Sequence, residues 1–99
     1  MKLNKHESIN RLVDKLLQRN RQWRVVDNWE ADNYAVGICG KEDVRRLVYV
    51  STYNRDEDHY DYECEAPSGP DPKDYEVLAH GENVDYETLF AAIETHLNA

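Results

Sequence analysis

The chain has 99 residues, of which 40% are apolar, and this is enough for one small core, so we expect a single domain over residues 1–99. Twenty acidic residues against twelve Lys and Arg give a net charge of -8. Neither nucleic acid nor a membrane is an expected partner, because phosphates are bound by clustered cations and a membrane span needs about 18 consecutive apolar residues. The charge instead favours a basic protein partner.

The first predicted element is an amphipathic helix from about Asn4 to Arg19. Its apolar stripe has helical spacing and consists of Ile9, Leu12, Val13, Leu16 and Leu17. Asn4, followed by Glu7 three residues later, is similar to a capping box and predicts the start of the helix. The other face carries Arg11, Lys15 and Arg19, a row of like charges for which we expect acidic partners. A helix here, in place of an apolar signal core, favours a cytoplasmic location.

Five strands are predicted after this helix, because β-branched and aromatic residues then alternate between turn signals. Their expected ranges are Trp23–Trp29, Tyr34–Cys39, Val44–Tyr53, His59–Glu65 and Tyr75–His80. The third contains four consecutive apolar or aromatic residues from Leu47 to Val50, so we expect it to be central and covered on both faces. The loop Ala66–Pro72 holds all three prolines, and Gly81-Glu82-Asn83 is predicted to be a turn.

A second helix is predicted from Asp85, as its cap, to about Leu97, with an apolar stripe of its own. Two one-sided helices around sequential short strands predict an α+β, two-layer sandwich: an antiparallel sheet of four to five strands with both helices on one face.

Chemical motifs are few. Cys39 and Cys64 lack the spacing of a zinc or redox site and are expected to be buried free thiols. The acidic run from Asp56 to Glu65 lacks the glycine of a calcium loop, and no phosphate-binding glycine motif occurs. We therefore expect no metal, no cofactor and no enzymatic activity. A small hydrolase stays open as an alternative, because carboxylates can converge in space without a sequence signal.

Charge and aromatic residues together predict a partner-binding surface. Residues 1–24 hold seven basic and two acidic residues, whereas residues 25–99 hold five basic and eighteen acidic ones, together with all seven tyrosines. The candidate side chains on one face of the fourth strand are His59 and the acids Asp61, Glu63 and Glu65, and the preceding turn adds Asp56 and Asp58. Trp29 and Asp32 in the loop before the second strand are further candidates. Aromatic rings beside acids suit recognition of a basic protein surface.

The layout also resembles a known class of proteins. A strand Leu47–Tyr53 leads to a strand Tyr60–Glu65 and a closing helix Tyr86–Leu97 in a small acidic chain, which is similar to the immunity proteins of bacterial toxin–immunity pairs. The resemblance implies a non-catalytic inhibitor that occludes a basic toxin. An alternative is a small-molecule or peptide-binding domain with a pocket between helices and sheet, lined by Trp23, Trp29 and tyrosines.

Overall fold

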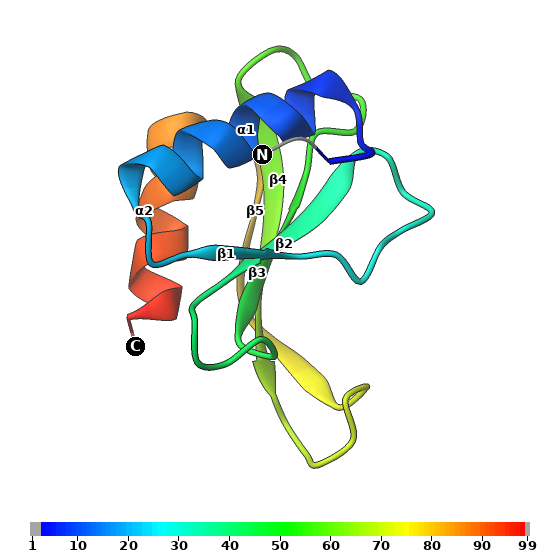
Figure 1. Cartoon of the computed structure of the whole chain (residues 1–99), viewed down its shortest axis with the longest axis vertical. Helices are drawn as coiled ribbons and strands as arrows, with labels where there is room; N and C mark the ends of the chain where they lie inside the picture. The colour runs from blue at the N-terminus through cyan, green and yellow to red at the C-terminus, as the bar shows by residue number, and fades with distance from the viewer. Residues whose placement is uncertain (1–2, 99) are drawn as a thin grey trace.

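The computed structural model describes residues 3–98 and places a helix at each end of a five-stranded sheet (Figure 1). The elements are α1 (Glu7–Arg19), β1 (Arg24–Val26), β2 (Ala35–Cys39), β3 (Leu47–Ser51), β4 (His59–Pro67), β5 (Tyr75–Asp85) and α2 (Tyr86–Leu97). Neighbouring strands are antiparallel and follow the chain in the order β1-β2-β3-β4-β5. The predicted α+β class and strand succession are confirmed.

Both helices pack on one face of the sheet. Leu12 and Leu16 of α1 and Leu89 and Ile93 of α2 are fully buried in one apolar cluster. The sheet supplies alternate residues of its three central strands to this cluster: Ile38, Val48, Val50, Tyr60 and Cys64, with Tyr62 packed against it. Because side chains of a strand alternate between faces, the residues between these positions lie on the opposite, helix-free side, which we call the open face.

The central strand β3 is covered on both faces, as its unbroken apolar run predicted. It pairs with β2 through Ile38↔Val48 and with β4 through Tyr49↔Glu63. The second of these pairs lies on the open face. The register therefore sets an aromatic ring directly beside a carboxylate there.

The predicted start of the first helix was wrong. The helix begins at Glu7, and its cap is His6, whose Nδ1 accepts a hydrogen bond of 3.1 Å from the backbone N–H of Ser8. Asn4 lies two residues before the cap, so the expected capping box does not form. The expected acidic partners of the cationic row are present: Arg11 pairs with Glu7 in the helix, Lys15 with Asp58 and Arg19 with Glu87.

The predicted turn Gly81-Glu82-Asn83 was also wrong, because β5 continues through it to Asp85. Asn83 has a φ of 53°, and its N–H donates to the Asp61 carboxylate at 2.9 Å, which holds an irregularity inside the strand. The first strand is shorter than predicted, Arg24–Val26, and β4 extends to Pro67. Asp85 caps α2, as predicted, by accepting from the N–H of Thr88 at 2.8 Å.

The end of β4 and the start of β5 form a hairpin that projects away from both helices at the lower end of Figure 1. All residues of β5 from Tyr75 to His80 are exposed. Among the described residues, neither helix has the length and apolar character needed to cross a membrane. Outside the core, the sheet has two accessible regions: its open face and its β5 edge.

Candidate functional site

A hollow of about 390 Å³ on the open face contains four of the eight residues that the sequence predicts to bind a partner. Four acids line it, namely Asp61, Glu63, Glu65 and Glu82, and so do three aromatic side chains, namely Trp29, Tyr49 and Tyr75. Tyr62, His80 and Gly81 complete the lining, although the Tyr62 side chain packs against the helix-side cluster. We call this set the acidic hollow. Of the lining residues, all within the described chain, none is Lys or Arg.

Trp29 reaches the hollow from the loop between β1 and β2. Its ring lies 5.1 Å from that of Tyr49, centroid to centroid, at an angle of 58°. The sheet makes room through Gly37, where a Cβ would lie 2.9 Å from the Trp29 ring and 2.8 Å from Val26 Cγ1. A glycine is therefore required at this point for the close approach of the indole.

Lys5 fixes the same loop from the other side. Its ammonium donates to the carbonyls of Trp29 and Asp32, both at 2.7 Å, and pairs with the Asp27 carboxylate at 3.1 Å. The Lys5 side chain is only 2% exposed. Sequence reasoning missed this residue, since a lone lysine before a helix carries no pattern that predicts a buried role.

The acids of the hollow differ in how they are neutralised. Asp61 accepts a 2.9 Å hydrogen bond from Arg55 Nε in addition to that from Asn83, so it has a structural role in joining β4 to β5. Within residues 3–98, Glu63 and Glu82 form no ion pair, and both are exposed. These two carboxylates are therefore free to meet an external cation.

Glu65 is buried, which differs from the solvated position expected for it. Its pKa is raised because burial disfavours the charged carboxylate, and the negative charge of Glu63 raises it further. Burial likewise raises the pKa of the Tyr49 hydroxyl. A positive charge brought into the hollow would relieve the repulsion between Glu63 and Glu65.

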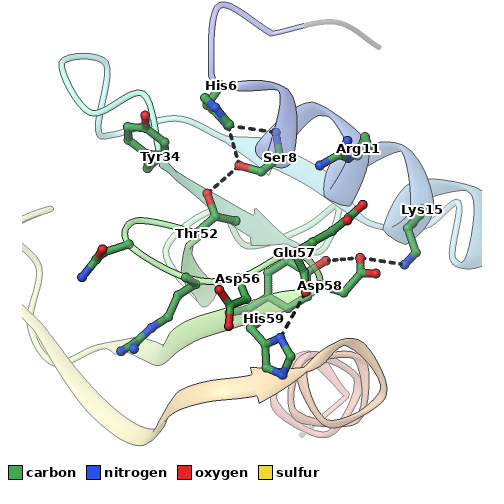
Figure 2. A pocket seen from close by; sticks show the side chains of 13 residues that line it. His6, Ser8, Arg11, Lys15, Tyr34, Thr52, Asp56, Glu57, Asp58 and His59 are labelled. Carbon is green, nitrogen blue, oxygen red and sulfur yellow. Dashed lines mark hydrogen bonds and ion pairs between the residues drawn. The ribbon is translucent and has the colours of Figure 1, made fainter.

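The other predicted acids of β4 and its turn lie elsewhere. Asp56, Asp58 and His59 line a separate groove of about 370 Å³ between α1 and the β3–β4 loop (Figure 2). Here Lys15 Nζ lies 3.8 Å from Asp58 and 4.0 Å from the Tyr86 ring centroid. This groove mixes both signs of charge, so the expected continuous acidic row from His59 to Glu65 is divided between two sites.

At the other end of this groove, His6, Ser8 and Thr52 form a hydrogen-bonded chain (Figure 2). The Ser8 hydroxyl lies 2.9 Å from His6 Nδ1 and 2.7 Å from the Thr52 hydroxyl. A serine beside a histidine is the arrangement of a nucleophile and its base. Here, however, the same Nδ1 accepts the Ser8 backbone N–H, so helix capping accounts for the contact.

The remaining predicted residues have structural surroundings. Asp32 is exposed on the Trp29 loop, where its carboxylate accepts from the Tyr34 N–H at 2.9 Å, and it does not line the hollow. Trp23 packs against Phe90 in the core on the helix side, whereas Trp29 is on the open face. The two tryptophans therefore do not line one pocket.

The metal-ligating and thiol side chains of the described residues form no reactive site. Within residues 3–98, no three His, Cys, Asp or Glu side chains lie together in a way that could hold a metal ion. Cys39 and Cys64 are buried and free, as predicted. Burial raises the pKa of both thiols, which keeps them in the unreactive protonated form.

Comparisons of the chain with protein-family models, curated proteins and solved structures gave no match.

Proposed function

We propose that this protein is a non-catalytic binding module that recognises a basic protein partner through the acidic hollow. The observation that carries the proposal is the composition of this site: four carboxylates and the aromatic side chains of Trp29, Tyr49 and Tyr75, with no Lys or Arg among the described residues that line it. Aromatic rings supply buried area at protein interfaces, and unpaired acids attract cationic partners and accelerate encounter.

Glu65 supports a binding role in a second way. A buried carboxyl beside another acid lowers the stability of the folded chain at neutral pH, because desolvation and repulsion both oppose its ionisation. Groups with such perturbed ionisation are concentrated at functional sites. A cationic partner would turn this unfavourable interaction into a favourable one.

The proposal extends to the class of partner. An immunity-type inhibitor would use the hollow to occlude a basic toxin in the bacterial cytoplasm. The fold class and net charge of -8 suit this role. A toxin gene next to the gene for this chain would support it, and toxin activity titrated to zero at one equivalent of the chain would test it.

Affinity capture from the source lysate tests the broader binding function. Wild type, E63K/E82K and the control E94K, an exposed position on α2 away from the hollow, would each be immobilised and compared at low and high salt. We expect wild type and E94K to retain one basic protein at low salt, and E63K/E82K to lose it. Equal retention by all three variants would contradict the assignment of the hollow.

A further inference from the structure

The outer edge of β5 is a long strand edge without a partner. β5 has eleven residues, is last in the strand order and pairs only with β4. Within residues 3–98, no other segment forms backbone hydrogen bonds with Tyr75–Glu82. The opposite edge of the sheet, β1, has only three residues. An unpaired edge of this length can accept an added strand from another chain.

Several features that usually protect a strand edge are missing from β5. It contains neither Lys nor Pro, and it holds three large apolar side chains that are strongly exposed: Tyr75 at 53%, Val77 at 42% and Leu78 at 53%. Two irregularities interrupt its pairing with β4, one of them at Leu78, which is skipped between the pairs Glu65↔Val77 and Cys64↔Ala79. On either side of Leu78, over Tyr75–Val77 and Ala79–Gly81, the pairing is regular, so an incoming segment has backbone to pair with.

The two sides of this edge differ in chemistry. On the open face, His80 and Glu82 of β5 belong to the acidic hollow. On the helix side lies an apolar groove of about 440 Å³, where small side chains of α2, among them Ala91 and Ala92, face Ala79 of β5. Side chains of an added strand would point alternately toward these two surroundings.

We infer that β5 accepts an extended segment of the basic partner in which Lys or Arg alternates with small apolar residues. The cations would lie beside Glu82 and the hollow, and the apolar side chains would enter the groove beside α2. This inference rests on the proposed function and specifies the chemistry of the partner. A second copy of the chain fits less well, because β5 carries Glu76, Glu82 and Asp85 without Lys or Arg, so two such strands would repel.

The test uses a labelled nine-residue peptide of alternating lysine and valine, with blocked ends, and measures its binding to the full chain by fluorescence anisotropy. Two control peptides are compared with it. One has the same composition with all lysines in a single block. The other has the same sequence but is N-methylated at every second residue, so that it cannot donate backbone hydrogen bonds along one edge. V77K places a cation on the proposed edge, and V44K is its control, because Val44 is also exposed, at 57%, but lies before β3.

We expect the alternating peptide to bind wild type and V44K with affinities within about twofold of each other. Its affinity for V77K, and the affinity of both control peptides for wild type, should be about tenfold weaker or worse. Backbone amide exchange of residues 75–82 should slow when the alternating peptide is bound. If the block or N-methylated peptide bound wild type as tightly as the alternating peptide, strand addition would be wrong, and charge attraction alone would explain the binding. Dimerisation of wild type at micromolar concentration that V77K abolishes would make a second copy the occupant.

The captured partner separates this inference from the proposed function. If its binding needs Glu63 and Glu82 but is unchanged in V77K and leaves the amides of residues 75–82 unprotected, the hollow is the binding site and strand addition is wrong. If the partner is bound equally by E63K/E82K and wild type, the proposed function is wrong.

Discussion

Replacing Lys5 by Met should release the loop that presents Trp29 to the acidic hollow. The substitution keeps the length of the side chain but removes three donors, which bind the carbonyls of Trp29 and Asp32 and the carboxylate of Asp27. Each acceptor would have to find water or remain unpaired. The expected result is a less stable protein with a more mobile Trp29.

The size of the effect follows from the surroundings of each group. Breaking a buried ion pair costs about 3–5 kcal/mol, but the Asp27 side chain is 31% exposed and can be rehydrated, which lowers the figure. We expect a loss of about 2–3 kcal/mol in the free energy of unfolding. For a chain of this length, that corresponds to a fall in Tm of roughly 10–15 °C.

Chemical denaturation followed by circular dichroism measures this loss, and acrylamide quenching of tryptophan fluorescence reports the release of the loop. Lys41→Met is the matched control, since Lys41 is exposed in the loop before β3, and it should change stability by less than about 0.5 kcal/mol. A loss below about 1 kcal/mol for Lys5→Met, with quenching equal to wild type, would refute the anchoring role of Lys5.

Three other expectations can be checked in the isolated protein. Because the pKa of Glu65 is raised above its ordinary value of 4.5, the wild type loses stability as pH rises from that value through the pKa in the folded chain; Glu65→Gln should therefore gain stability relative to wild type as pH rises above about 4.5, and parallel pH profiles would contradict this. Burial raises the pKa of Tyr60 to about 12, so unfolding should become easier between pH 10 and pH 12, and less steeply in Tyr60→Phe; a titration of all tyrosines near pH 10 would disprove it. Leu16→Ala and Ile93→Ala should each cost about 2–5 kcal/mol in a urea melt, since both side chains are fully buried, and losses below about 1 kcal/mol would mean that the core is described wrongly.

Strand faces could be predicted from the sequence wherever the alternation is regular. Tyr60, Tyr62 and Cys64 alternate with Asp61, Glu63 and Glu65, and this period of two predicted which side of β4 faces the core. The end of β5 was predicted wrongly, because Gly81, Glu82 and Asn83 are residue types typical of a turn. Contacts between residues far apart in the sequence show that the strand continues: Gly81 and Val84 pair with β4, and the Asn83 N–H donates to Asp61, 22 residues away.

The site could be predicted in its composition but not in its assembly. The sequence predicted acidic and aromatic residues as the binding groups. It did not predict that Trp29 and Glu63 line the same hollow, because this depends on tertiary contacts of Gly37 and Lys5 with the Trp29 loop. The burial of Glu65 has the same origin. Local patterns carry no information on such contacts, since they depend on how the loop between β1 and β2 folds back over the sheet.

The most direct test of the account is the association rate of the captured partner with E63K/E82K, measured by stopped-flow fluorescence against wild type and E94K. We expect the double reversal to slow association by about tenfold at low ionic strength, and this difference to shrink in 1 M salt, where the screening length is about 3 Å. E94K should associate as fast as wild type under both conditions. If E63K/E82K also associates at the wild-type rate at low ionic strength, the acidic hollow does not recognise the partner.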